Sequence, residues 1–298
     1  MKIPQELLKR IYEIEIIVKK KISDVNSGAH RSIFFGEGFD FEEYREYSAG
    51  DDVKKIDWHL LARIPDKVYR RCYREDKQLT IWILADLSGS LRFGYKDLTK
   101  KELLVKSVAY LGFSAAHELD KIGLIAFTNK IEKVLIPKSG KDWVYYMLNK
   151  IWDSSYSENT DIVSALRKAK NYLRGSVMVF LLSDFLDENC SNNNSAFWDE
   201  IKTLVGSHDL IPVVFDEDPN FLLDASGNVR LKDLESKREY TFQLSKKNRE
   251  KFAERIQERH SILRNQFIKS GTRAIFIKGE ADFDKFLKFF LIRKKRRG

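Results

Sequence analysis

Residues 80 to 90 read TIWILADLSGS, an apolar run followed directly by polar turn residues. The run from Thr80 to Ala85 predicts a strand buried on both faces. Apolar strands and helical segments then alternate to the end of the chain, which is typical of a mostly parallel sheet covered by helices. The further strands are expected at 121–128, 177–182, 210–215 and 274–277, with hairpins at 130–136 and 222–243. The sequence therefore predicts an α/β fold of the Rossmann-like kind.

The chain divides into three regions that differ in composition and in the pattern of apolar residues. Residues 1–29 are expected to form an N-terminal helix that packs on the body, because apolar residues recur at helical spacing. Residues 30–78 carry glycines, turn signals and short aromatic stretches, which predict a β-rich elaboration. The first half of that region is acidic and the second half is basic, so pairing between the halves would neutralise both. Residues 79–298 hold the alternating strands and helices.

Composition excludes several classes of protein. A chain of 298 residues with 43% hydrophobic residues and only 5 Pro is expected to be packed rather than disordered. No apolar run approaches the roughly 20 residues of a membrane-spanning helix, and the N-terminus lacks a signal-peptide pattern, so we expect a cytoplasmic protein. Cys72 and Cys190 are far apart, which gives no support for a disulfide framework or a zinc site. The net charge of +9 leaves polyanion binding open as a weaker alternative, without specific nucleic-acid recognition.

Oxygen-bearing side chains follow the strands where ligands bind in an open parallel sheet. Asp86, Ser88 and Ser90 come directly after the first strand, and Asp184 follows the strand at 177–182. Thr160 lies on a loop between them, at the start of a helical stretch. Carboxylates and hydroxyls are the ligands of a small hard cation such as Mg²⁺ or Mn²⁺. We therefore expect these residues to form a metal site with a position open to an incoming carboxylate.

Ordinary structural roles are also open to each of these residues. Asp, Ser and Gly dominate turns, so Asp86, Ser88 and Ser90 could simply leave the strand. Thr160 could be a helix N-cap, and Asp184 could be a strand terminator. Their joint order on successive loops at one edge of the sheet is what favours the metal site.

The order DxSxS, a loop Thr and a strand-end Asp resembles the metal-ion-dependent adhesion site of von Willebrand factor type A domains. More narrowly, the chain resembles the bacterial family catalogued as domain of unknown function 58, from about residue 30 to about residue 290. The stretches that carry the resemblance are GEGFDFEEYREYSAGDDVKKIDWHLLAR at 36–63, ADLSGS at 85–90, NTDIVSAL at 159–166 and LLSDF at 181–185. The resemblance implies a von Willebrand factor A-like fold and no established enzymatic activity. It also implies partnership with a MoxR-type AAA+ ATPase, beside which such proteins are usually encoded.

A second candidate interaction site lies in the β-rich region. Asp51, Asp52, Asp57 and Trp58 belong to the stretch GDDVKKIDW, which is part of the family resemblance. They are candidates for partner binding. The alternative is that the aspartates form a turn and that Trp58 packs against the sheet.

The sequence contains no recognised catalytic motif. Gly140-Lys141 lacks the other residues of a P-loop, and the five histidines have no metal-ligand spacing. The best enzyme alternative is a magnesium-dependent phosphohydrolase in which Asp86 is the nucleophile and Asp184 holds the metal. Ser88 stands where haloacid-dehalogenase-like phosphatases carry a second acid. We therefore expect a metal-dependent protein-interaction domain without catalysis.

Overall fold

The computed structural model describes residues 3–29, 40–74, 78–92, 94–95, 98–154, 161–186, 190, 195–216, 228–232, 239–243, 245–279 and 282–295. Within this part of the chain, no helix combines the length and the apolar character that crossing a membrane requires.

The described strands form a six-stranded central sheet in the order β12-β9-β8-β3-β6-β7. Its strands are β3 (Thr80–Asp86), β6 (Lys121–Phe127), β7 (Ile131–Lys138), β8 (Met178–Ser183), β9 (Asp209–Phe215) and β12 (Ile275–Ile277). Only the pairing of β7 with β6 is antiparallel among these six strands, so the predicted, mostly parallel sheet is confirmed.

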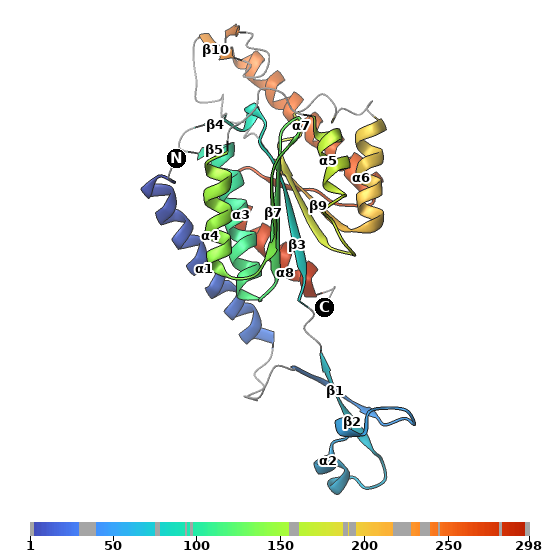
Figure 1. Cartoon of the computed structure of the whole chain (residues 1–298). Helices are drawn as coiled ribbons and strands as arrows, with labels where there is room; N and C mark the ends of the chain where they lie inside the picture. The colour runs from blue at the N-terminus through green and yellow to red at the C-terminus, as the bar shows by residue number, and fades with distance from the viewer. Residues whose placement is uncertain are drawn as a thin grey trace.

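Helices cover both faces of this sheet (Figure 1). One face carries α1 (Gln5–Ala29), α3 (Lys100–His117), α4 (Lys141–Trp152) and α8 (Phe283–Lys295). The other carries α5 (Ile162–Ala169), α6 (Ser195–Ser207) and α7 (Lys246–Lys269). Successive residues of β3 alternate between two hydrophobic cores, since Ile81 and Ile83 belong to the first and Trp82 and Leu84 to the second. The sheet is therefore buried on both faces, as the apolar strands predicted.

The N-terminal helix packs on α3 through the apolar stripe that its sequence predicted. Leu7, Ile11, Ile14 and Val18 are all buried in the first core. The helix runs from Gln5 to Ala29, within the range of residues 1–29 expected from the sequence.

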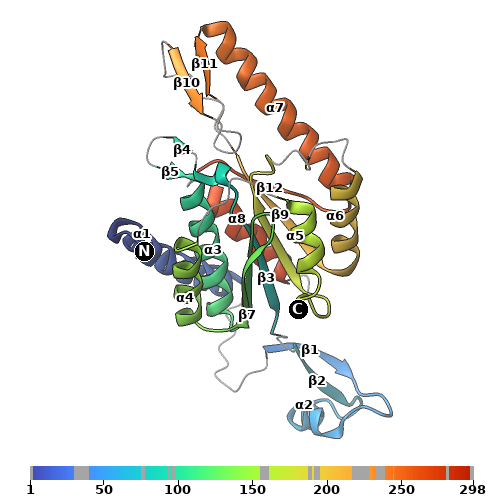
Figure 2. The ribbon, with the colours of Figure 1, turned by 45° about the horizontal axis from the view of Figure 1, so that its top comes forward.

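The region between α1 and the sheet contains one antiparallel hairpin of β1 (Asp40–Glu46) and β2 (Tyr69–Arg74). A short 3-10 helix, η1 (Val53–Lys55), and α2 (Trp58–Arg63) lie between its strands. We call residues 40–74 the hairpin arm. Both views place it beyond the amino-terminal end of β3, opposite the end of the molecule that carries β10 (Asn228–Lys232) and β11 (Glu239–Gln243) (Figures 1 and 2). The expected pairing of acidic and basic halves is confirmed by the ion pairs Lys67–Glu46, Arg70–Asp51 and Arg71–Asp57.

Candidate metal centre

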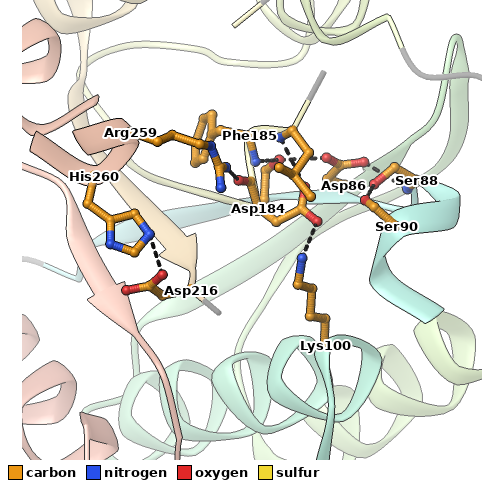
Figure 3. A network of polar contacts seen from close by, with 11 residues as sticks. Asp86, Ser88, Ser90, Lys100, Asp184, Phe185, Asp216, Arg259 and His260 are labelled. Carbon is orange, nitrogen blue, oxygen red and sulfur yellow. Dashed lines mark hydrogen bonds and ion pairs between the residues drawn. The ribbon is translucent and has the colours of Figure 1, made fainter. Parts of the chain in front are cut away.

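Asp86 and Asp184 lie at the same edge of the sheet because their strands are direct neighbours. β3 and β8 are parallel and in register, with Ala85 opposite Leu182, so both acids follow at the carboxyl ends of the two central strands. Each is 2% exposed. Figure 3 shows the two residues in one polar network. The juxtaposition expected from the sequence is thus present.

The Asp86 carboxylate is held by neutral donors. Its Oδ1 accepts a hydrogen bond from the Ser88 amide (2.8 Å), and its Oδ2 accepts one from the Ser183 hydroxyl (2.6 Å). Burial, and after it the negative charge of Asp184, raise the pKa of Asp86 to about 7, although the bonds from Ser183 and Ser88 act in the opposite direction. The negative charge of Asp86 is therefore poorly compensated by the protein, which is the condition a bound cation would relieve.

Ser88 and Ser90 bring two hydroxyls together beside this carboxylate. The chain turns into a short 3-10 helix, η2 (Gly89–Arg92), and the Oγ atoms of Ser88 and Ser90 lie 2.8 Å apart (Figure 3). Ser88 is buried and Ser90 is half-buried. The alternate spacing in DLSGS thus places two hydroxyl oxygens within hydrogen-bonding distance of each other. This closeness would allow both oxygens to bind the same metal ion.

Thr160 lies outside the described residues, but the residue after it immediately precedes α5, which begins at Ile162. The N-cap of this helix is Asp161, whose side chain accepts a hydrogen bond from the Ser164 amide (3.0 Å). The capping role that the sequence left open for Thr160 therefore belongs to Asp161. The Asp161 amide donates to the Thr128 carbonyl (3.4 Å), just beyond β6. This bond places the start of α5 beside the carboxyl end of the strand that neighbours β3.

Sequence reasoning missed Lys100, which pairs with Asp184. The Lys100 Nζ atom lies 2.9 Å from Asp184 Oδ2, and the two side chains are 5% and 2% exposed. Lys100 is the first residue of α3, which is capped by Thr99 and Glu102 in a reciprocal capping box. A lysine in the first turn of a helix interacts unfavourably with the helix dipole, and a nearby carboxylate offsets that interaction. That local mismatch is the signal by which Lys100 could have been found.

The loop after β8 is also tied to α7 (Figure 3). Arg259 donates to the backbone carbonyl of Asp184, and His260 pairs with Asp216, the residue that follows β9. Phe185 adopts a left-handed backbone conformation (φ 52°), and its amide donates to the Ser183 hydroxyl (2.9 Å). Side chains from α3 and α7 therefore both fix the conformation of the Asp184 loop.

The donor set fits a hard divalent cation better than a soft one. Two carboxylates and two hydroxyls are near one another, and all four ligand atoms are oxygens. Among the described residues, no group of three or more His, Cys, Asp or Glu side chains could hold a metal. Hydroxyls and water would therefore have to complete the coordination, as Mg²⁺ readily accepts.

The four candidate residues of the hairpin arm have different surroundings. Asp57 is 3% exposed and accepts hydrogen bonds from the Tyr44 hydroxyl, from Arg71 Nε and from two amides at the start of α2. Asp52 caps η1, and Asp51 pairs with Arg70. Arg71 and the other donors hold the pKa of Asp57 well below its usual range. The Asp57 carboxylate thus serves the internal structure of the arm.

Trp58 is 60% exposed, so the expectation that it packs against the sheet is wrong. It is the first residue of α2, and Figure 1 shows α2 in the hairpin arm, away from the central sheet.

The chain is similar to proteins whose roles are uncharacterised. It is 25% identical over 226 residues to the uncharacterized protein Rv1480 of Mycobacterium tuberculosis, covering 75% of this chain and 69% of that protein. An aerotolerance-related membrane protein from Bacteroides fragilis has a TM-score of 0.49 at 13% identity, covering 73% of this chain and 99% of that chain. A von Willebrand factor type A structure from Catenulispora acidiphila has a TM-score of 0.35 at 13% identity, covering 67% and 45%. The family model described as "Protein of unknown function DUF58" matches residues 43–262, most of the chain, and the protein belongs to that family.

Proposed function

We propose that this protein is a metal-dependent protein-interaction domain. In this proposal Mg²⁺ or Mn²⁺ binds to Asp86, Ser88 and Ser90, and to Thr160 and Asp184 directly or through water. An Asp or Glu of another protein fills the remaining position. The observation that carries the proposal is the pair of buried carboxylates at the ends of adjacent strands, of which Asp86 has its pKa raised to about 7.

The surroundings of Asp86 favour binding over catalysis. A nucleophilic carboxylate must be ionised and must reach the substrate, whereas Asp86 is 2% exposed and its pKa is raised by burial. The Ser183 hydroxyl donates to Asp86, and Ser88, whose amide also donates to it, carries the other nearby hydroxyl. Hydroxyl groups are poor general acids, so neither side chain is suited to proton transfer. The magnesium-dependent phosphohydrolase therefore remains the second candidate. Turnover of generic phosphatase substrates that disappears in Asp86→Asn would reverse this order.

Metal binding is tested by calorimetric titration with MgCl₂ or MnCl₂. We expect one site, which Asp86→Ala removes. Asp120→Ala is the matched control, because Asp120 is also a buried acid (1% exposed) but accepts from the Leu79 amide at the opposite end of β3. Unchanged binding in Asp86→Ala would remove this site from the proposal.

The resemblance to MoxR-associated proteins supports an AAA+ ATPase of that type as the partner. If an Asp or Glu side chain of the ATPase completes the metal site, EDTA and Asp86→Ala should each abolish co-purification of the two proteins. Truncation after Ile292 removes the basic C-terminal residues and should leave co-purification intact. Association that survives both EDTA and Asp86→Ala would place the contact elsewhere on the chain.

A further inference from the structure

Lys100 is a buried cation at a position that is unfavourable for one. It occupies the first turn of α3, where the helix dipole is positive, and its side chain is only 5% exposed. A buried ammonium group is costly unless a charged partner compensates it. Asp184 supplies that partner, with its Oδ2 atom 2.9 Å from Lys100 Nζ.

Both carboxylate oxygens of Asp184 already accept hydrogen bonds. Oδ2 accepts from Lys100, and Oδ1 accepts from the Leu186 amide at 3.2 Å. The Arg259 guanidinium donates to the backbone carbonyl of the same residue, so positive groups approach Asp184 from both α3 and α7 (Figure 3). A divalent ion that binds Asp184 must therefore enter a place where protein cations already lie, with little water to screen the repulsion.

We infer that Lys100 is a resident cation that competes with the divalent metal for Asp184 and thereby sets the affinity of the site for metal. This inference rests on the proposed function and deepens it. When the metal binds, the ammonium group either leaves Asp184 or remains close to the ion. In the second case Lys100 adds one positive charge to the loaded site, which strengthens its preference for a carboxylate of the partner.

The test compares Lys100→Met with the wild type in a calorimetric titration with MgCl₂ at pH 8. Methionine keeps much of the length of the side chain and removes its charge. We expect at least a tenfold tighter affinity for Mg²⁺ in Lys100→Met. Lys101→Met is the matched control, because Lys101 is the next residue of α3 but donates to the Trp152 carbonyl (3.1 Å), and its affinity should stay within twofold of the wild type. Equal or weaker binding in Lys100→Met would overturn the inference.

Thermal unfolding gives an independent readout. In EDTA, Lys100→Met should melt at a lower temperature than the wild type, because Asp184 then lacks its partner. Saturating Mg²⁺ should raise the melting temperature of Lys100→Met more than it raises the melting temperature of the wild type, because the ion replaces the missing positive charge of Lys100. Lys100→Gln serves as a second variant if the Met variant does not fold.

The outcomes separate the two proposals. If the wild type binds Mg²⁺, Asp86→Ala does not, and Lys100→Met binds like the wild type, only the role of Lys100 is refuted. If neither the wild type nor Lys100→Met binds metal, the metal dependence of the proposed function fails as well. Binding that appears only in Lys100→Met supports the inference in its strongest form, in which Lys100 alone occupies the site of the wild type.

Discussion

Replacing Asp86 by Asn should make the metal-free protein more stable than the wild type. Asn has nearly the shape of the carboxylate, and its side-chain oxygen can still accept from the Ser88 amide. It carries no charge, so the burial of Asp86 and the repulsion from Asp184 no longer oppose folding. A residue that destabilises the free protein in this way is typical of a binding site.

The size of the effect follows from the shifted pKa. The pKa of Asp86 is about 7 in the folded protein against an ordinary value of 3.8. Between these values the folded state holds a proton that the unfolded state has lost, so the stability of the wild type falls as pH rises. Each pKa unit corresponds to about 1.4 kcal/mol, so the destabilisation reaches about 4 kcal/mol at pH 8 and about 2 kcal/mol at pH 5.

Urea unfolding in EDTA at pH 5 and pH 8 measures this difference. We expect Asp86→Asn to have a higher free energy of unfolding than the wild type at both pH values. The difference in free energy should be larger at pH 8 than at pH 5. Asp120→Asn is the matched control at the other end of β3: its side-chain oxygen can likewise accept from the Leu79 amide, but it does not lie beside Asp184, so we expect no comparable stabilisation. Saturating Mg²⁺ should narrow the margin, since it stabilises only the wild type. An Asp86→Asn protein that is no more stable than the wild type at pH 8 would refute the reasoning.

Three further changes test other parts of the structure. Asp57→Ala should destabilise the hairpin arm by about 1 to 2 kcal/mol through loss of the α2 cap, seen as faster proteolysis within residues 40–74. Gly112→Ala should lower the free energy of unfolding by about 1 to 3 kcal/mol, seen as a lower urea midpoint, because the new Cβ would lie 2.5 Å from Val144 Cγ1. Arg259→Met should speed amide exchange in α7 without abolishing Mg²⁺ binding, because Arg259 donates to the backbone carbonyl of Asp184 and not to its proposed metal ligand, the carboxylate.

Each of these three predictions has a result that contradicts it. Unchanged proteolysis of Asp57→Ala would mean that the arm does not depend on its buried cap. Wild-type stability of Gly112→Ala would mean that α4 moves freely away from α3. Loss of Mg²⁺ binding in Arg259→Met would mean that α7 holds the Asp184 loop in its binding conformation.

The fold could be predicted from the sequence because its signals are local. Apolar runs such as Thr80 to Ala85 specify buried strands, and their alternation with helices specifies a parallel sheet. The approach of Asp86 to Asp184 followed from the same pattern, since parallel strands end at one edge. The end of α5 was less predictable. A glycine commonly follows a helix terminus, yet α5 ends at Ala169, and Gly175 (φ 68°) belongs to the turn before β8.

The remaining features depend on contacts between distant segments. The pairing of Lys100 with Asp184 spans 84 residues, and the contact of Arg259 with the Asp184 carbonyl spans 75. Neither partner can be chosen from spacing alone. Asp57 and Trp58 are adjacent in the sequence but opposite in exposure, because Asp57 is buried as the cap of α2 whereas Trp58, the first residue of that helix, is 60% exposed. The position of the arm relative to the sheet decides the surroundings of Trp58, and no local pattern encodes that position.

The strand order has a consequence for the dynamics of the site. β3 and β8 are each hydrogen-bonded on both edges, whereas β7 and β12 are the outermost of the strands that the structure describes. Fraying at either edge therefore leaves the spacing between Asp86 and Asp184 unchanged, and the two acids separate only when the centre of the sheet opens. Amide exchange in β3 and β8 should consequently be among the slowest in the protein. Metal affinity and global stability would then depend on the same folding unit. A substitution that destabilises the centre of the sheet should therefore weaken metal binding as well.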